Sequence, residues 1–225
     1  MIEPKIEVTN DGSHTLVHPK YKAHYHSTAG AVEESNYIYL NTGFHYMLNN
    51  FQLDEISVLE MGFGTGLNAF NTLLASEELQ VKTNYVGIEK YPLVQNTVKK
   101  LNYVEALQAE IFKTQFEAIH TLEAEVSKPI AAHFNLKKQH IDFFEVDYTN
   151  QFHVIYFDAF SPNEQQDLWS ASLFELMYKA LRRNGVLVTY CSQGNAKRAL
   201  REVGFTVKRL HGPPSKRHIL RATKA

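Results

Sequence analysis

The chain has 225 residues, a formal net charge of −1 at pH 7, and an ordinary globular composition with 44% hydrophobic and 21% charged residues. This composition excludes disordered and collagen-like chains, and no apolar run approaches the ~18–20 residues of a membrane span. Cys191 is the only cysteine and no signal peptide is visible, so we expect a cytoplasmic protein with no disulfide, no bound metal and no membrane contact.

The charge is distributed unevenly along the chain. Residues 182–225 hold eleven basic side chains and one acid, Glu202, which gives +10, whereas residues 1–181 carry −11. A basic third of this kind predicts a surface that attracts a polyanion. Cations that merely offset acids folded nearby would give the same charge count, so both interpretations stay open at this point.

Strand and helix patterns alternate along the first half of the chain. Asn10-Asp11-Gly12 between two β-like runs predicts a hairpin over residues 6–17. Mixed apolar and aromatic spacing predicts a helix over residues 31–50 that ends near Asn49-Asn50. The other predicted elements of this half are a strand at 56–59, a helix at 67–75, a strand at 84–89, a helix starting near Pro92, and helix over 103–126, closed by Lys128-Pro129.

The alternation continues in the second half. The predicted elements are strands at 134–141 and 153–158, a helix at 170–182 stopped by Asn184-Gly185, a strand at 185–191, a helix at 195–203 closed by Gly204, and a terminal hairpin around Pro213-Pro214. Short apolar strands between helices predict a mostly parallel sheet covered on both faces.

The terminal hairpin added to such a sheet resembles the layout of class I methyltransferases. We therefore expect an α/β, Rossmann-like fold with a mostly parallel sheet, a C-terminal antiparallel hairpin and a small N-terminal β-hairpin extension. Residues 1–50 are predicted to form an extension, a hairpin plus a helix, packed on a catalytic domain of residues 51–225.

A glycine loop follows the strand at 56–59 and opens the next helix. Glycines at 62, 64 and 66 permit positive φ and a close approach of the backbone to a ligand. A dinucleotide fingerprint would need glycine at position 67, which is Leu67, and this disfavours a dinucleotide dehydrogenase. Glu60 at the strand end fits a ligand with a cation and hydroxyls, such as S-adenosylmethionine, better than a pyrophosphate. A glycine turn without any ligand is the alternative.

Further acids stand at the ends of the next two strands. Glu89 ends the strand at 84–89, the expected place for a carboxylate that binds ribose hydroxyls. Asp142 ends the third strand, where an acid accepts a hydrogen bond from an adenine amino group. Asp147 competes with Asp142 for that role, and each of these acids could equally be an ordinary solvated side chain.

Asp158 and Phe160 follow the fourth strand, in the segment Phe157-Asp158-Ala159-Phe160-Ser161-Pro162. Open α/β sheets place their chemistry at the carboxyl ends of the strands. An alkyl amine with a pKa of about 10 is mostly protonated, and a carboxylate can accept its proton and orient the lone pair for methyl transfer. Phe160 is suited to stack a planar base. A helix cap for Asp158 and a core position for Phe160 are the alternatives.

Several longer segments carry a family resemblance over nearly the whole chain. They are DGSHTL at 11–16, YHS and GAVEES within 25–35, LEMGFGTGLN at 59–68, IEKYPL at 88–93, YFDAFSP at 156–162, LW at 168–169, GVLVTYC at 185–191 and GPPSKR at 212–217. With these segments the sequence resembles the methyltransferase half of the bifunctional tRNA 5-methylaminomethyl-2-thiouridine biosynthesis protein MnmC and its stand-alone form, MnmD.

The resemblance implies a reaction and its partners. It implies transfer of a methyl group from S-adenosylmethionine to the exocyclic amine of 5-aminomethyl-2-thiouridine, the wobble uridine in the anticodon stem-loop of tRNA, with catalysis by Asp158. The tRNA then accounts for the basic C-terminal third. The chain has no room for the FAD-dependent oxidase half, so we expect no FAD and an upstream enzyme that supplies the aminomethyl group.

With the resemblance, the candidate site has a cofactor part and a substrate part. The candidates for cofactor binding are Tyr25, Ser27, Glu60, Gly62, Phe63, Gly64, Thr65, Gly66, Asn68, Glu89, Lys90 and Asp142. The candidates for substrate binding are Phe160, Ser161, Pro162, Trp169, Lys216 and Arg217.

Two other functions remain as alternatives. One is an N-methyltransferase for a protein or small-molecule amine, which the family motifs and the basic third disfavour. The other is a catalytically inactive tRNA-binding module, which the intact glycine loop, Glu89 and Asp158 disfavour.

Overall fold

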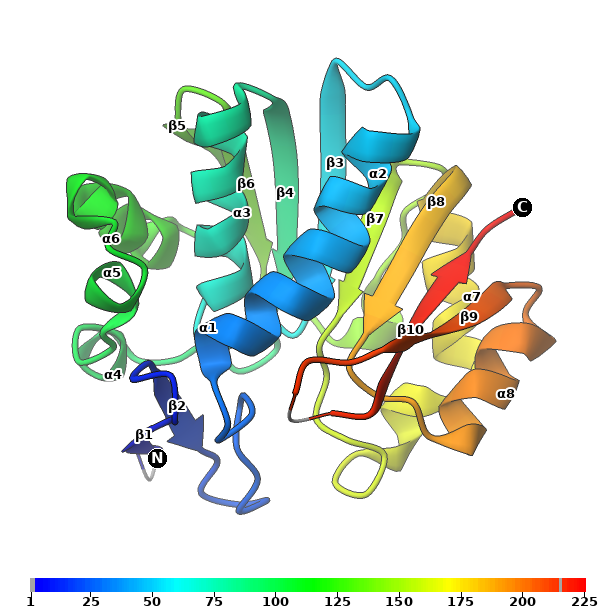
Figure 1. Cartoon of the computed structure of the whole chain (residues 1–225), viewed down its shortest axis with the longest axis horizontal. Coiled ribbons are helices and arrows are strands. Elements are labelled where there is room, and N and C mark those ends of the chain that lie inside the picture. The colour runs from blue at the N-terminus through cyan, green and yellow to red at the C-terminus, as the bar shows by residue number, and fades with distance from the viewer. Residues whose placement is uncertain (1–2, 215) are drawn as a thin grey trace.

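The computed structural model describes residues 3–214 and 216–225, and within them the main sheet has eight strands (Figure 1). Five strands run parallel, and β5, β10 and β9 pair antiparallel with their neighbours. Their order is β5 (Ser127–Ala131), β6 (Phe134–Gln139), β4 (Lys82–Ile88), β3 (Glu55–Met61), β7 (Phe152–Phe157), β8 (Leu181–Thr189), β10 (His218–Thr223) and β9 (Thr206–His211). The predicted parallel sheet and C-terminal hairpin are confirmed.

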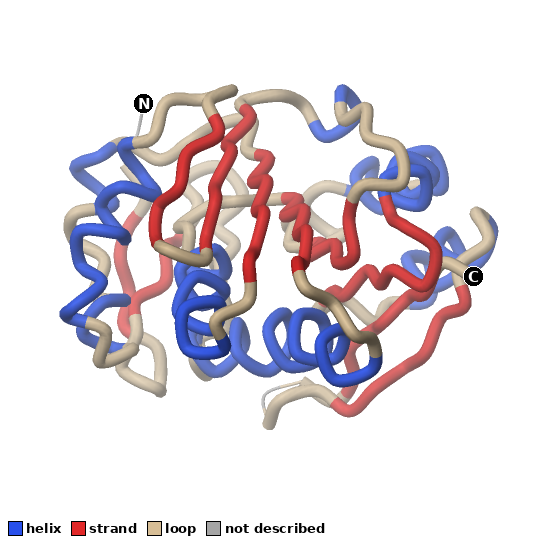
Figure 2. Tube along the Cα trace, turned by 90° about the horizontal axis from the view of Figure 1, so that it is seen from above, coloured by secondary structure: helices blue, strands red, loops and turns tan. Residues whose placement is uncertain are grey.

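Helices cover both faces of the sheet (Figure 2). In β7, Val154 and Tyr156 face one core, and Ile155 and Phe157 face the other. The first core is closed by α1 (Ala31–Glu34), η1 (Ser35–His45), α2 (Tyr46–Asn50) and α3 (Leu67–Leu79), and the second by α7 (Ala171–Ala180) and α8 (Gly194–Glu202). Burial on both faces explains why these strands read as continuous apolar runs.

The predicted helix at 31–50 is confirmed as one continuous run of α1, η1 and α2, whose middle part, η1, is π-helical. Gly43 allows this run to lie close to the sheet, since a Cβ there would lie 3.1 Å from side-chain atoms of Val154, Tyr156 and Val188. The run shares a core with β3 and β7. The division of the chain at residue 50 into an extension and a catalytic domain stays a prediction.

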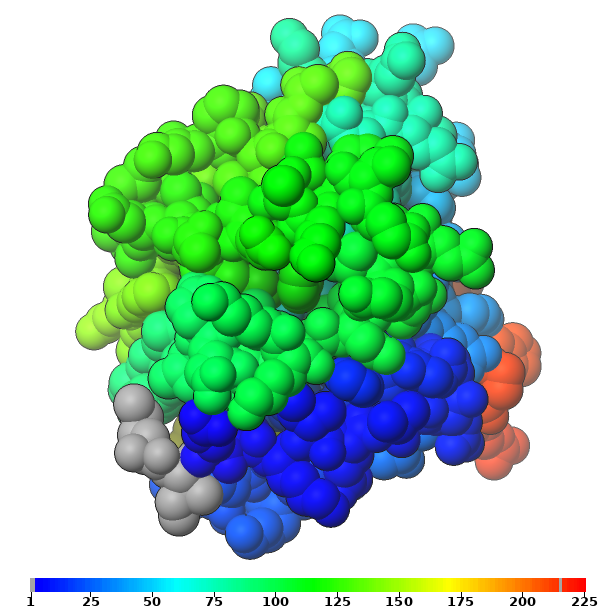
Figure 3. Space-filling model, turned by 90° about the vertical axis from the view of Figure 1, so that its left-hand side faces the viewer, coloured from blue at the N-terminus to red at the C-terminus, as the bar shows by residue number. Residues whose placement is uncertain are grey.

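The N-terminal hairpin, β1 (Lys5–Val8) and β2 (His14–Val17), is antiparallel as predicted. It is fastened to residues 100–102, where the Asn102 side chain accepts from the His14 backbone N–H at 2.8 Å and donates to the Gly12 carbonyl at 2.9 Å. Figure 3 shows this blue segment lying against the green region of α4 (Gln95–Val98), α5 (Tyr103–Ala106) and α6 (Lys113–Thr121). None of the helices in the described residues is long and apolar enough to cross a bilayer.

Several predicted helices have different bounds in the structure, and two of these differences have a clear local cause. The helical stretch at 103–126 is broken into α5, η2 (Glu110–Phe112) and α6, because Gln108 has a φ of 52°, which a right-handed helix cannot contain. Lys128 and Pro129 belong to the edge strand β5, where proline is tolerated. The helix predicted to reach residue 182 ends at Ala180, because Leu181 already pairs with Phe152 in the sheet.

Candidate active site

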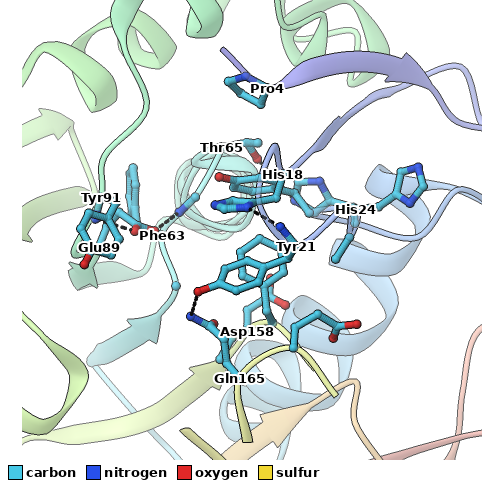
Figure 4. A pocket seen from close by; sticks show the side chains of 18 of the residues that line it. Pro4, His18, Tyr21, His24, Phe63, Thr65, Glu89, Tyr91, Asp158 and Gln165 are labelled. Carbon is cyan, nitrogen blue, oxygen red and sulfur yellow. Dashed lines mark hydrogen bonds between the residues drawn. The ribbon is translucent and has the colours of Figure 1, made fainter. Parts of the chain in front are cut away.

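A cavity of about 1030 Å³ opens at the carboxyl ends of β3, β4 and β7, where open α/β sheets bind ligands (Figure 4). Its walls come from the glycine loop, the segments after β4 and β7, and residues 18–28 of the N-terminal segment. Small-molecule sites usually measure roughly 300–1,000 Å³. The cavity therefore has the capacity for a nucleoside-sized ligand together with part of a second one.

The glycine loop needs its glycines for conformation and for space. Gly62, Gly64 and Gly66 have φ angles of 97°, 47° and 71°, in the left-handed region. A Cβ on Gly62 would lie 2.6 Å from the carbonyl oxygen of Asp158, and one on Gly66 would lie 2.9 Å from the His120 ring. Gly62 and Gly64 line the cavity together with Phe63 and Thr65, whereas Gly66 begins α3 against His120.

We expect Gly62→Ala to destabilise the fold more than Gly12→Ala. Both positions have a positive φ, which costs an alanine about 1–3 kcal/mol, but Gly12 has no atom within 4 Å of its Cβ position. Gly62→Ala adds a collision with the backbone of Asp158. Urea unfolding of the two variants measures the difference, and equal free energies of unfolding would contradict the close packing of this loop.

Glu89 ties the glycine loop to the end of β4. Its Oε2 accepts from the Gly64 N–H at 3.0 Å and its Oε1 accepts from the Tyr91 N–H at 2.9 Å. Burial raises the pKa of this carboxyl, and the two backbone donors oppose that shift. Each carboxylate oxygen can accept a further hydrogen bond, so Glu89 can bind ligand hydroxyls from the wall of the cavity.

The two acids that competed for the adenine contact lie in different places. Asp142 caps the 3-10 turn η3 (Phe143–Glu145) and its Oδ2 accepts from Lys90 Nζ at 2.8 Å, and both residues line the cavity. Asp147 lies outside the cavity lining, exposed and paired with Lys179 at 2.8 Å. Geometry therefore leaves Asp142 as the candidate of the two.

Asp158 lies directly after β7 and is half-buried at the wall of the cavity. Tyr39 OH donates to Oδ1 at 2.5 Å, and Asn68 Nδ2 donates to Oδ2 at 2.9 Å. Burial raises the pKa of Asp158 to about 7, against the effect of these two donors. A carboxyl group with this pKa exchanges protons near neutral pH, as a general base must. The Tyr39 contact was not predicted, because an aromatic in an apolar helix pattern looks like any core residue.

Glu60 and Asn68, which were predicted to bind the cofactor, form a hydrogen bond with each other. Glu60 is 1% exposed, and its two oxygens accept from Asn68 Nδ2 at 2.9 Å and from Tyr85 OH at 2.8 Å. Burial raises the pKa of Glu60 well above its usual range. Both side chains border the cavity, but their polar atoms form a network beneath Asp158.

A group of aromatic rings lines one side of the cavity. The Phe160 ring lies 5.2 Å from His18, 5.6 Å from Tyr21 and 5.2 Å from Tyr25, measured between ring centroids. Ser161 and Ser27 line the same cavity, and Tyr25 also packs against Gly64. Of these residues, Phe160 and Ser161 were predicted to bind substrate, and Tyr25 and Ser27 were predicted to bind the cofactor. The aromatic composition of residues 18–25 was the available signal for His18 and Tyr21.

Three predicted substrate residues lie outside the cavity lining. Trp169 is 3% exposed in the second core, and its Nε1 donates to the Phe160 carbonyl at 2.8 Å, so it supports the loop without facing the cavity. Pro162 is buried nearby and Arg217 is exposed beyond the cavity. Membership in a family motif does not reveal which way a side chain faces.

Lys216 reaches the cavity from the turn between β9 and β10. Its Nζ lies 2.9 Å from Glu34 Oε1 and 4.8 Å from the ring centroid of Tyr190. The other oxygen of Glu34 accepts from the Ser27 N–H at 2.7 Å. Glu34 and Tyr190 are therefore further cavity residues that sequence patterns did not single out.

Two histidines of the N-terminal segment, His18 and His24, have different contact partners. His24 pairs with Glu7 at 2.9 Å, while His18 packs on the Tyr21 ring at a centroid distance of 4.6 Å. Within residues 3–214 and 216–225, no three His, Cys, Asp or Glu side chains are arranged to hold a metal ion.

Comparison with known proteins identifies the family to which the chain belongs. Residues 99–225 match the model of a family described as S-adenosyl-L-methionine-dependent methyltransferase. The chain is 28% identical to the tRNA 5-methylaminomethyl-2-thiouridine biosynthesis bifunctional protein MnmC of Burkholderia multivorans, over 98% of this chain and 35% of that protein. It is 31% identical to the protein of the same name from Campylobacter fetus, over 76% of this chain and 30% of the relative.

The fold agrees with this placement. The structure of MNMC2 from Aquifex aeolicus superimposes with a TM-score of 0.77 at 24% identity, over 100% of this chain and 71% of that one. The present chain spans about a third of the length of the curated relatives named above. Since the family model covers more than half of the sequence, the chain belongs to the S-adenosyl-L-methionine-dependent methyltransferases and resembles the methyltransferase part of MnmC.

Proposed function

We propose that the protein transfers a methyl group from S-adenosylmethionine to the exocyclic amine of 5-aminomethyl-2-thiouridine in tRNA. The names of the relatives supply the substrate class. The observation that carries the proposal is a half-buried carboxyl group, Asp158, with a pKa of about 7, in the same cavity as the glycine loop.

The loop side of the cavity fits S-adenosylmethionine. Gly62 and Gly64 give the loop its left-handed backbone along the cavity wall, Glu89 offers acceptors for ribose hydroxyls, and Asp142 offers one for an adenine amino group. When bound, this cofactor supplies an electrophilic methyl group on a positively charged sulfur. The neighbouring acids favour a cation at this end of the cavity.

Asp158 would prepare the amine. An alkylammonium group with a pKa of about 10 carries no free lone pair at neutral pH. The ionised Asp158 carboxylate can accept its proton, and its place in the cavity wall lets the carboxylate orient the nitrogen by a hydrogen bond. Phe160, with His18 and Tyr21 around it, would hold the ring of a uridine turned out of its stack.

The basic third supplies exposed charge for tRNA. Arg198 and Arg201 lie on α8, and Lys208 and Arg209 lie on the edge strand β9. In the described part of the chain, the salt bridges found do not involve these four side chains. Their lack of pairing with acids disfavours the interpretation that they merely offset charge, and it supports contact with phosphates.

We expect the triple variant Lys197→Ala, Arg198→Ala and Arg201→Ala to raise the KM for tRNA and to flatten its salt dependence. These side chains lie on α8, and each lost phosphate contact reduces counterion release. The matched control replaces Lys82, Lys113 and Lys128, exposed lysines on β4, α6 and β5 toward the other edge of the sheet. Normal stability with an unchanged salt slope in the α8 variant would remove this surface from the proposal.

Methyl incorporation distinguishes the proposal from its alternatives. The protein is incubated with labelled S-adenosylmethionine and, in parallel, with tRNA, with cell protein and with small amines. Label in tRNA supports the proposal, whereas label in protein or in a small amine favours a different N-methyltransferase. Absence of S-adenosylmethionine binding by calorimetry would favour an inactive tRNA-binding module.

A further inference from the structure

The carboxylate of Asp158 is held by one donor on each oxygen. Tyr39 OH donates to Oδ1 at 2.5 Å and Asn68 Nδ2 donates to Oδ2 at 2.9 Å. Tyr39 is 2% exposed and Asn68 is 3% exposed, so solvent does not compete for these contacts. Hydrogen bonds to a charged acceptor are shorter and stronger than those between neutral groups. The carboxylate plane is therefore fixed by two different elements, η1 and α3.

The helical run at 31–50 controls both donors. Tyr39 belongs to η1 itself, and Ser35, also in η1, donates to Asn68 Oδ1 at 2.6 Å. Ser35 Oγ in turn accepts from Asn71 Nδ2 at 2.8 Å. The amide hydrogens of Asn68 are both used, one by Asp158 and one by Glu60. This chain of contacts leaves Asn68 a single orientation, and π-helical segments are frequent at functional sites.

We infer that Tyr39 is a positioning residue for Asp158. Its hydroxyl group keeps the Asp158 carboxylate ionised and keeps the free lone pairs of the carboxylate turned to the substrate amine. The inference rests on the proposed function for the identity of the amine, but the hold on the carboxylate does not. Tyr39 does not need to touch the substrate. Ser35 acts in the same direction at one remove, through the Asn68 amide.

The charged groups around Asp158 make its ionisation sensitive to the Tyr39 hydrogen bond. The charged and titratable groups that face Asp158 come from six elements or their ends. Glu34 and Glu60 disfavour its ionisation, while Lys216 favours it. Tyr39 favours ionisation directly by its hydrogen bond, and Asn68 does so from α3. The set is Glu34, Tyr39, Glu60, Tyr85, Tyr190 and Lys216. Loss of the Tyr39 donor shifts this balance toward the protonated acid.

The test is Tyr39→Phe, which removes one oxygen and keeps the ring. We expect the pKa of Asp158 to rise by about one unit, measured by carbon NMR of protein labelled at aspartate carboxyl carbons, with Asp158→Asn to identify the signal. The acidic limb of the pH profile for kcat should move upward by the same amount. Turnover at pH 7 should fall several-fold and recover above pH 9, while the affinity for S-adenosylmethionine stays at the wild-type value.

Tyr156→Phe is the matched control. Its hydroxyl is equally buried, lies 3.3 Å from Thr72 Oγ1, and belongs to a ring 5.3 Å from that of Tyr39, yet it has no hydrogen bond to Asp158. This variant should leave the Asp158 pKa in place. Ser35→Ala, which releases the Asn68 amide oxygen and removes the acceptor of Asn71 Nδ2, should raise it by less than Tyr39→Phe does, and it provides the test if Tyr39→Phe does not fold.

The NMR titration needs no substrate, so the two claims fail separately. An Asp158 pKa and a pH profile that do not move in Tyr39→Phe or Ser35→Ala would overturn the positioning role, whatever the substrate is. A shifted Asp158 pKa in a protein that methylates no tRNA would retain the positioning role and overturn the proposed function.

Discussion

Replacement of Asp158 by Asn is expected to reduce methyl transfer by roughly 10²–10⁴-fold, the usual contribution of a general base. The amide has nearly the same shape, and it can still accept from Asn68 and meet the Tyr39 hydroxyl, but it cannot take a proton from the amine. Single-turnover kinetics at pH 7.5 measure the loss. Activity that returns at high pH, where the amine is already neutral, would support the assigned role.

The same variant makes a separate prediction for stability. The folded pKa of about 7 lies above the ordinary value of 3.8, so the folded state holds this proton more tightly than the unfolded chain. The stability due to Asp158 is therefore present below pH 4 and is lost as the pH rises through 7. Asp158→Asn should unfold at a higher temperature than wild type at pH 8, and the advantage should shrink toward pH 4. For the kinetic prediction, an Asp158→Asn variant that methylates its substrate at the wild-type rate at pH 7.5 would contradict the catalytic assignment.

Glu89→Ala is expected to weaken the binding of S-adenosylmethionine about 5- to 150-fold, equivalent to about 1–3 kcal/mol for polar groups left without partners. The Gly64 and Tyr91 N–H groups lose their acceptor together with the ligand hydroxyls, so the loop loses a support as well as a contact. Calorimetric titration measures the dissociation constant.

Glu117→Ala serves as the control for Glu89→Ala. Glu117 is an exposed acid on α6, so its replacement removes the same charge at a place away from the cavity. Its affinity should match the wild type. Equal affinities for Glu89→Ala and Glu117→Ala would take Glu89 out of the cofactor site.

Much of the fold follows from local pattern, because buried strands need apolar runs and their ends need polar or glycine residues. Glu89, Asp142 and Asp158 were found in this way, as acids that follow strands whose carboxyl ends lie at one edge of the sheet. The broken helix at 103–126 was not, since Gln108 adopts a left-handed conformation that its residue type does not announce.

Residues that act from another element escape sequence patterns. Tyr39 is separated from Asp158 by 119 positions, and its apolar surroundings in the helix give no sign of the hydroxyl contact. Trp169 shows the converse, because its place in a family motif suggested contact with substrate, whereas the structure buries it beneath the Phe160 loop. Asp142 and Asp147 could be separated only by geometry, since both follow β6 at short range.

Nucleoside analysis of tRNA tests the central claim most directly. The protein is incubated with S-adenosylmethionine and tRNA that carries 5-aminomethyl-2-thiouridine, and the digested nucleosides are identified by mass spectrometry. We expect 5-aminomethyl-2-thiouridine to be replaced by 5-methylaminomethyl-2-thiouridine with the wild-type protein and to persist with Asp158→Asn. Persistence of the aminomethyl nucleoside with a folded wild-type protein that binds S-adenosylmethionine would contradict the account.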